Sequence, residues 1–408
     1  MKVNANLQGL LPLPSKSETY LAGFTILGSL NQSDPGILSQ FSFTLEVKQV
    51  APTVTPQVTV TATQQTTPTI FPPLALNALS PQSINAPLND RSGHGMVWDG
   101  NDDLLFVFGG IDGAGNMLND LWSYSPLTGQ WSQINSTTAS TGSCASDSLP
   151  APRMNAAMVW DSVHKQILLY GGVGVNSHYL SDLWSYSPST GVGGWTRIAC
   201  LGNGPGARAA NAVWNGSQML LVGGMDKYGP LADFWSYTPN PASAGSWQRL
   251  GELPMGPRAY QTLVWDSTDN KLFAFGGLDT SSVQRDDFYS YSASTGWNLI
   301  APSSTSNPKA RQQAIGVWDS KDNKLLLIGG WNDNDPQGPY WGLWAYDPGT
   351  NLWGLLTPLD KSNNHIIPGR TDSAMVWDAK DQEAFIYAGA GNGRVGSTLN
   401  DLWTVTSS

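Results

Sequence analysis

Charged side chains are scarce in this sequence, and basic ones are scarcer than acidic ones. Asp, Glu, Lys and Arg make up 13% of the 408 residues, against ~25% in typical globular proteins, and the net charge is −10. A nucleic-acid partner needs a basic stripe, and an anionic membrane surface also attracts basic residues, so we expect neither. No apolar run approaches the ~20 residues that cross a bilayer, so we expect no membrane span.

The sequence also lacks a recognisable export signal at its start, because residues 1–14 have no apolar centre. The protein is therefore either cytosolic or a mature form whose initiator was replaced. A Thr/Pro/Val tract over 51–73 is typical of the stalks of surface proteins, and the charge is low while Ser, Thr and Asn are abundant. These features, with the cysteine pair described below, favour an extracellular or cell-surface location.

Histidine is rare, with four residues at 94, 164, 178 and 365, and no two stand at a metal-ligand spacing. The segment Asn332–Asp335 is rich in oxygen ligands, but it lacks the spacing and the terminal Glu of a calcium loop. We therefore expect no metal site and no cofactor.

Tryptophan is abundant, and 16 of its 18 residues belong to a repeat. A V-W-D phrase, with Asn for Asp once, recurs at Trp98, Trp160, Trp214, Trp265, Trp318 and Trp377. Six or seven residues before each stands an arginine: Arg91, Arg153, Arg208, Arg258, Arg311 and Arg370. A Gly-Gly doublet follows in five copies, and Ala388–Gly389 replaces it in the sixth. The period of 51 to 62 residues fits a four-stranded blade rather than a helical repeat.

Each copy contains four short segments that are rich in β-forming residues and bounded by turn residues, which we name strands a to d. In the first copy they are GMVWD, LLFVFGG, LWSYSP and WSQIN. The ordered set Arg-x₆-Trp-Asp, Gly-Gly, Asn-Asp-Leu-Trp and a trailing Trp resembles the kelch motif over residues 91–408. The resemblance implies an all-β propeller in which strand a of each blade lines a central channel.

The ends of the repeat predict the number of blades. The sixth copy stops at 404–408 and has no strand d, whereas Leu76–Pro81 aligns with the strand d segment Trp297–Pro302. We expect this upstream segment to supply the missing strand, so that no sheet edge is left open and the ring has six blades. The predicted organisation is a small β-rich segment at 1–50, a linker at 51–73 and the propeller at 74–408.

The segment 1–50 is too short to build a stable core alone. Phe41, Phe43, Leu45 and Val47 alternate with polar residues, which predicts a strand. This strand either packs on its own propeller or joins a neighbouring chain, and in the second case residues 1–60 would mediate self-assembly.

An enzyme is the alternative interpretation, since kelch-type propellers include some. The chain resembles galactose oxidase in blade type only, because neither cysteine lies near a tyrosine that could complete a copper–radical site. It is also similar to six-bladed kelch proteins that interconvert sialic acid anomers, where arginines at the channel mouth could bind a carboxylate. A carbohydrate-active enzyme of the epimerase or oxidase class is therefore the second candidate.

The six repeat arginines have two interpretations. A ligand site usually breaks the symmetry of a repeat. A residue present in every blade more often belongs to the frame, by which we mean the contacts that hold each blade together. Aspartates recur before the strand c aromatic and are the expected partners: Asp120, Asp182, Asp233, Asp287 and Asp401. Gly342 takes this place in the fifth copy, so Arg311 is expected to lack its usual partner.

A ligand-binding loop is predicted between strands b and c of blade five. Trp331 and Trp341 are the two tryptophans outside the repeat, and Tyr340, Asn332, Asp333 and Asp335 accompany them. Exposed rings beside these polar groups would suit stacking on a sugar or an aromatic hot spot for a protein, whereas rings folded onto the blade would be structural. The b–c and d–a loops emerge on one face, which is the expected ligand surface.

Cys144 and Cys200 lie in the d–a loops that follow blades one and two, and both loops emerge on this face. We therefore expect a disulfide between them, with two free thiols as the alternative. Together these features predict a non-catalytic extracellular or surface module that binds a glycan or protein and could be a subunit of an assembly.

Overall fold

The computed structural model describes residues 74–79, 88–134, 137–138, 149–188, 193–198, 204–240, 243–304, 306–335, 339–340, 342–356, 367–391 and 398–407. All of them belong to the unit Phe71–Ser408. The predicted β-rich segment 1–50, the linker 51–73, both cysteines and Trp341 lie outside the described residues.

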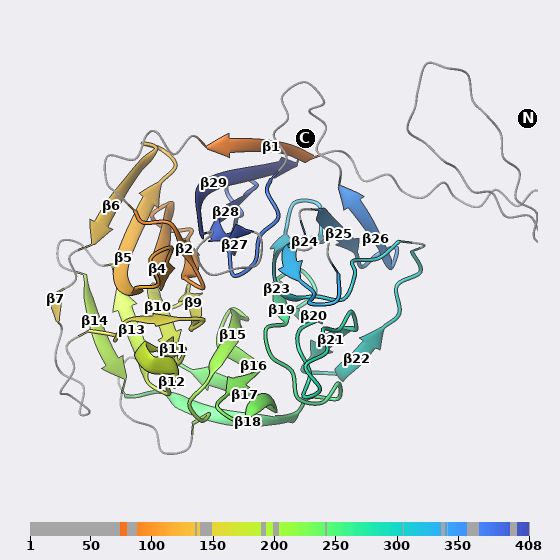
Figure 1. Cartoon of the computed structure of the whole chain (residues 1–408), viewed down its shortest axis with the longest axis horizontal. Helices are drawn as coiled ribbons and strands as arrows, with labels where there is room; N and C mark the ends of the chain where they lie inside the picture. The colour runs from red at the N-terminus through yellow and green to blue at the C-terminus, as the bar shows by residue number, and fades with distance from the viewer. Residues whose placement is uncertain are drawn as a thin grey trace, which may run out of the picture. The chain divides into compact units, whose positions relative to one another are not determined.

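The described residues form seven sheets. Six of them are the blades, which are arranged radially, as Figure 1 shows and as the sequence repeat predicts, and the seventh is a small three-stranded sheet within residues 153–179. In blades one to five, strands a, b, c and d come from one repeat, in that order. Blades one to three are β3 (Gly95–Asp99), β4 (Leu104–Asp112), β5 (Met117–Ser125) and β6 (Gln130–Ile134); β9 (Ala157–Asp161), β10 (Gln166–Tyr170), β13 (Leu183–Ser187) and β14 (Gly194–Ile198); and β15 (Ala209–Trp214), β16 (Met219–Asp226), β17 (Gly229–Thr238) and β18 (Ser246–Glu252).

Blades four and five are β19 (Thr262–Asp266), β20 (Lys271–Phe275), β21 (Phe288–Ser292) and β22 (Gly296–Ile300); and β23 (Gln312–Asp319), β24 (Lys324–Trp331), β25 (Leu343–Asp347) and β26 (Leu352–Leu356). Blade six has β27 (Ala374–Asp378), β28 (Glu383–Ala390) and β29 (Thr398–Ser407) from its own repeat. Short pieces complete the order: β2 (Arg91–Ser92), β7 (Thr137–Thr138), β8 (Arg153–Met154), β11 (Val173–Gly174), the 3₁₀ turn η2 (Val175–Ser177) and β12 (His178–Tyr179).

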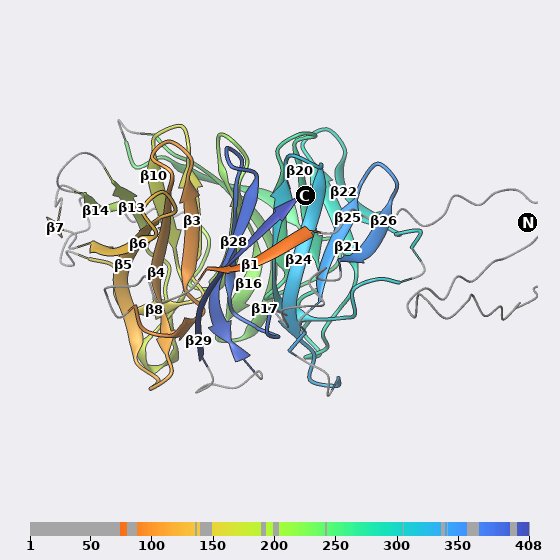
Figure 2. The same cartoon turned by 90° about the horizontal axis from the view of Figure 1, so that it is seen from above.

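The outermost strand of blade six comes from upstream of the first repeat. β1 (Leu74–Leu79) pairs antiparallel with β29, in a register that runs from Leu74 opposite Ser407 to Leu79 opposite Leu402. Figure 2 shows β1 lying along β29 from the side. The pairing predicted for this segment is therefore present, and it begins two residues earlier than the alignment of repeats suggests.

Apolar side chains pack between blades rather than within one blade. The described core consists of six clusters, and each draws its residues from two neighbouring blades. One of them joins blade one to blade six, where the ring centroids of Trp131 of β6 and Tyr387 of β28 are 5.2 Å apart. Blade one therefore packs on blade six just as the other neighbours pack on each other.

The recurrent tryptophans are explained by this packing. Trp98 stacks on Phe385 of the preceding blade with ring centroids 5.4 Å apart, and Trp160 stacks on Phe106 at 6.3 Å. Strand d tryptophans reach the preceding blade too, as Trp195 does on Phe108 at 5.1 Å. Each such pair contributes about 0.5–1.5 kcal/mol beyond the area it buries, so the repeat places its largest side chains where blades meet.

The aspartate of V-W-D stabilises the a–b turn. Asp99, Asp161, Asp266, Asp319 and Asp378 are all at most 1% exposed. In each case one carboxylate oxygen accepts a backbone N–H two residues ahead, at 2.8–3.0 Å. These turns all emerge on the face opposite the b–c and d–a loops.

Candidate functional site

The six repeat arginines are buried inside their own blades, with exposures of 0–3%. Each donates through Nη1 to the carbonyl of the first residue of its Gly-Gly or Ala-Gly doublet, as Arg91 does to Gly109 at 2.9 Å and Arg370 to Ala388 at 3.0 Å. In five blades the guanidinium also binds an aspartate at or just before strand c, in the pairs Arg91–Asp120, Arg153–Asp182, Arg208–Asp233, Arg258–Asp287 and Arg370–Asp401 at 2.5–2.9 Å. This geometry favours the frame interpretation of the arginines over ligand contact.

The same aspartates bind the strand c tryptophans. Trp122 Nε1 donates to Asp120 at 2.6 Å, and equivalent bonds occur in blades two, three and six. Burial opposes ionisation of Asp120, but the hydrogen bonds and charge of Arg91, together with the Trp122 bond, outweigh it and lower the pKa of the carboxyl. The carboxylate is therefore fixed between a guanidinium and an indole.

Blade five lacks this aspartate, as the sequence predicts from Gly342. Arg311 keeps its bond to Gly329 O at 2.9 Å, but the Tyr340 ring covers its guanidinium at 4.1 Å. Burial lowers the pKa of Arg311 to about 10, although the charges of Tyr340 and Asp335 oppose the shift. A cation–π contact thus replaces the ion pair in this blade.

The predicted ligand loop of blade five is largely engaged within the blade. Tyr340 is 8% exposed, and its hydroxyl donates to Asp335 at 2.9 Å. Asn332 donates to Ala310 O at 2.8 Å, and Trp331 Nε1 donates to Asp333 at 2.7 Å. The Trp331 ring remains partly exposed. The described half of the loop therefore has structural contacts at Tyr340 and an accessible aromatic at Trp331.

A second candidate site lies where the channel opens on the b–c/d–a face. Two residues after the arginine, the backbone of five blades adopts a left-handed conformation, at Gly93, Asn155, Tyr260, Gln313 and Asp372, with φ between +49° and +64°. Backbone bonds link these positions across blades, such as Asn155 N to Gly93 O and Gly93 N to Asp372 O, both 2.7 Å. We name these five residues the mouth ring.

Side chains in the mouth ring carry a conformational cost. A left-handed residue with a Cβ costs roughly 1–2 kcal/mol relative to a right-handed one, and glycine avoids this cost at position 93. Tyrosine, glutamine and aspartate nonetheless occupy equivalent positions. Strain of this kind concentrates at binding and active sites, so the mouth ring is a site candidate.

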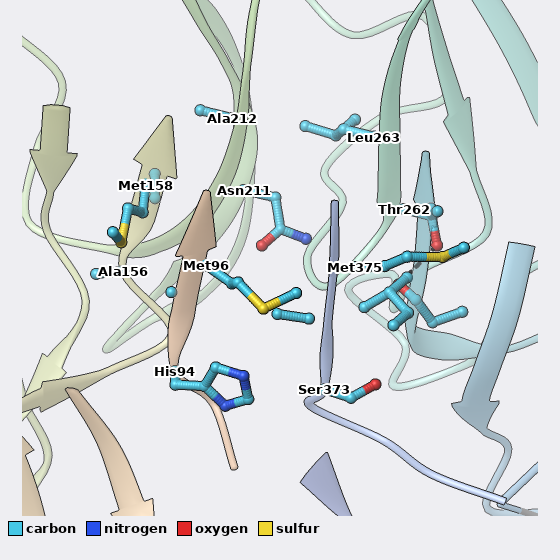
Figure 3. A pocket seen from close by; sticks show the side chains of 16 residues that line it. His94, Met96, Ala156, Met158, Asn211, Ala212, Thr262, Leu263, Ser373 and Met375 are labelled. Atoms are coloured by element: carbon cyan, nitrogen blue, oxygen red, sulfur yellow. Dashed lines mark hydrogen bonds between the residues drawn. The ribbon is translucent and has the colours of Figure 1, made fainter. Parts of the chain in front are cut away.

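The mouth ring lines a cavity of about 80 Å³, which we name the mouth chamber. A second cavity of about 150 Å³ follows along the channel, walled by strand a of all six blades. His94, Asn211 and Ser373 line both cavities, and Figure 3 shows their side chains coming from three different blades. Met96, Met158 and Met375 also line the second cavity.

Two polar side chains in this wall have no hydrogen-bond partner among the described residues. Both ring nitrogens of His94 and the hydroxyl of Ser373 are buried and unpaired. Burial and the neighbouring Arg91 charge lower the pKa of His94 to about 3, so the imidazole is neutral. Ser, His and Asp meet here, but no hydrogen bond joins Ser373 to His94, so they are not arranged as a nucleophilic triad.

Exposed apolar side chains lie on the b–c loops of three blades. Val175 of blade two, Tyr228 of blade three and Val283 of blade four are 57%, 84% and 39% exposed. They lie on the face that the sequence predicts as the ligand surface. Apolar groups around a polar cavity are typical of a recognition surface.

The chamber residues were not predicted from the sequence, apart from His94 as one of the scattered histidines. Their signal is the variation two residues after each arginine, where an otherwise regular repeat changes residue type. Within the described residues no cluster of His, Cys, Asp and Glu could hold a metal ion. The described part of the chain contains no helix long and apolar enough to cross a membrane.

Comparisons with known proteins agree with this architecture. Residues 75–251 match the family model of the KLHDC2/KLHL20/DRC7 Kelch-repeats domain. Bovine "Kelch domain-containing protein 2" is 27% identical over 307 residues, which cover 65% of this chain and 68% of that protein. The Arabidopsis thaliana "Serine/threonine-protein phosphatase BSL2" is 32% identical over 139 residues, and human "Host cell factor 1" is 25% identical over 201.

The match covers 33% of this chain but 13% of the phosphatase, and 45% of this chain but 9% of host cell factor 1. The similarity therefore concerns the repeat domain and not the whole of those two proteins. With the six-bladed fold and the arginine frame, these matches lead to one conclusion. The chain folds as a six-bladed kelch-type β-propeller, and its repeats are similar to those of the kelch-repeat family.

Proposed function

We propose that this protein is a binding module that recognises a segment of a partner protein across the channel mouth on the b–c/d–a face. The observation that carries the proposal is the mouth ring, where Tyr260, Gln313 and Asp372 occupy strained left-handed positions. Kelch-repeat domains generally act in protein binding and scaffolding, which supports a protein partner. The exposed side chains of Val175 and Tyr228 would provide apolar contacts beside the polar cavity.

The proposal also covers the location of the protein, its self-assembly and the chemistry of its ligand. A cell-surface or extracellular location is supported by the 51–73 tract and the low charge. Self-assembly through residues 1–60 would be tested by deleting them, and assembly that persists would contradict it. A glycan on Trp331 is the alternative ligand; a protein is favoured because Tyr340 covers Arg311 and is not available for stacking.

Replacing mouth-ring residues by glycine separates binding from stability. Tyr260→Gly and Asn155→Gly remove a side chain at positive φ, so they relieve backbone strain while changing the recognition surface. Asn270→Gly is the matched control, because Asn270 has a φ of +53° in an a–b turn on the opposite face. Peptides would be selected against the full chain from a random display library, with a glycan array as a parallel arm.

We expect the selected peptides to bind Tyr260→Gly at least about tenfold more weakly, a loss of roughly 1.4 kcal/mol, and to bind Asn270→Gly unchanged. Both variants should melt at or above the wild-type temperature. Selected peptides that bind every mouth-ring variant as they bind the wild type would refute the proposal. Saturable binding on the glycan array alone, lost on Trp331→Ala, would replace the protein partner by a glycan.

A further inference from the structure

The mouth chamber has an acidic residue in its wall with no basic partner. Asp372 lines the cavity, and no ion pair among the described residues involves it. The side-chain amide of Gln313 donates a hydrogen bond to its carboxyl group. The other titratable residues of the wall are His94 and Tyr260, and Tyr179 lies near Tyr260. The negative charge of a carboxylate in this place has no cationic partner, and burying such a charge costs free energy unless a ligand supplies the partner.

Two unpaired acceptors line the same cavity as this carboxyl. Ser373 follows Asp372 in the chain, and its hydroxyl has no partner. His94 of the neighbouring blade follows Gly93, whose N–H donates to the Asp372 carbonyl at 2.7 Å. The neutral imidazole of His94 offers one lone pair to the cavity that both residues line. Asp372, Ser373 and His94 therefore provide three acceptors at the junction of blades six and one.

We propose that the mouth chamber binds a primary ammonium group, supplied by a lysine side chain of the partner protein. An ammonium carries three N–H donors on one compact centre, which matches three acceptors around a small cavity. A guanidinium is planar and suits a bidentate carboxylate in an open fork, so it fits this junction less well. The Tyr260 ring, also in the wall, can face the cation. The lysine source rests on the proposed function, whereas the ammonium site does not.

The volume of the chamber limits what can enter it. A cavity of about 80 Å³ accepts a charged head group and its adjoining methylene but not a folded segment. Asp372 belongs to the mouth ring, so a lysine stem can reach it from the b–c/d–a face without entering the methionine-lined part of the channel. The net charge of −10 also attracts a cationic segment.

The test uses n-butylammonium as the probe, because it reproduces the lysine head group and stem. Binding to the full chain is measured by calorimetry and by the ring signals of isotopically labelled histidine, near pH 8, where the amine is protonated. Asp372→Asn is compared with Asp286→Asn, which removes the same charge from an exposed site that has no ion pair. n-Butanol and tetramethylammonium test the charge and the N–H donors separately.

We expect saturable binding in the millimolar range that perturbs the His94 ring, weakens at least about tenfold in Asp372→Asn and is unchanged in Asp286→Asn. Affinity should also fall about tenfold per pH unit below the titration of Asp372. Equal binding of n-butanol or tetramethylammonium, or no saturable binding, would overturn the ammonium site and leave water as the occupant of the chamber.

The source of the ammonium is decided with the selected peptides. Acetylation of one lysine of the peptide should abolish the part of the peptide affinity that depends on Asp372, whereas blocking the peptide's amino terminus should not. The reverse result would identify the amino terminus of the peptide as the ligand. Peptides that need Tyr260 but ignore Asp372 would refute this inference and leave the proposed function standing. Binding of n-butylammonium without binding of any peptide would support the ammonium site and refute the proposed function.

Discussion

The guanidinium of Arg311 lies 4.1 Å from the centre of the Tyr340 ring, where the other five blades place a carboxylate. The two contacts differ in strength. The hydrogen bonds of a bidentate Arg–carboxylate pair are roughly twice as strong as those between neutral groups. A cation–π contact contributes about 0.5–2 kcal/mol. Blade five is therefore the place where the frame can be strengthened.

Gly342→Asp should restore the missing ion pair and raise stability by about 1–2 kcal/mol. A Cβ at Gly342 meets Leu355 Cδ1 at 2.8 Å, and this side chain is 43% exposed and can move. Chemical denaturation would measure the gain, and Gly342→Asn is the uncharged control of similar size. An aspartate variant no more stable than the asparagine variant would show that Arg311 does not use the new carboxylate.

Removing a carboxylate from the frame should have the opposite effect. Asp182→Asn leaves Arg153, which is 1% exposed, without its charge partner, so we expect a loss of about 3–5 kcal/mol. Asp102→Asn removes the same charge from an exposed a–b turn and should change stability little. Similar unfolding midpoints for the two variants would contradict the frame role of the pair.

In five blades the first residue of the doublet is a glycine that closely approaches the backbone of the next blade. In Gly329→Ala the new methyl would lie 2.5 Å from the carbonyl oxygen of Arg370 in the next blade, at a φ of +76°. Gly115→Ala has a similar φ of +85° but no atom within 4 Å, so it isolates the backbone cost of about 1 kcal/mol. Thermal unfolding should show a larger loss for Gly329→Ala, and equal losses would remove the steric argument.

The disulfide between Cys144 and Cys200 remains a prediction. The backbone of β7 pairs in parallel with β14, so the chain leaving blade one runs beside the outer strand of blade two. In the chain-entropy model, a cross-link between Cys144 and Cys200 would stabilise the folded protein by roughly 4 kcal/mol. Peptide mapping of the purified protein without reductant should yield one cross-linked peptide that contains both cysteines. Two separately alkylated thiols would contradict the bond.

The frame could be predicted from the sequence because its residues repeat. Arginine recurs because each blade contains the same internal contact, tryptophan and glycine recur because adjacent blades meet in the same way, and Gly342 marked the single gap. The covering of Arg311 by Tyr340 could not be predicted, because it depends on how one non-repeated loop folds. Asp372 and Tyr260 were missed for a related reason, since their position has a common backbone conformation but no common side chain.

The stability of the protein should depend on pH through Asp372. Burial raises the pKa of this carboxyl to about 7, although the Gln313 hydrogen bond opposes the shift. The folded state therefore binds a proton more tightly than the unfolded state, in which the pKa is about 3.9. The contribution of this group to stability is complete below about pH 4, falls as the pH rises to 7 and is constant above that.

Asp372→Asn should abolish this dependence, because the amide resembles the protonated acid. The variant should match the wild type near pH 4 and exceed it above pH 7, by at most about 4 kcal/mol for a shift of three pKa units and by less if water enters the chamber. His94, whose pKa is lowered to about 3 in the folded state, binds a proton in the unfolded state within this window, but it does so in both proteins and cancels in the comparison. Tyr260, whose pKa burial raises, does not titrate in this window. Asp120, with its lowered pKa, affects both proteins equally at lower pH. Urea unfolding of both proteins across this range, with Asp286→Asn as the control, measures the difference. A difference that is independent of pH would show that folding does not raise the pKa of Asp372. A wild type that gains stability relative to Asp372→Asn as the pH rises would show that a cationic partner already lowers this pKa.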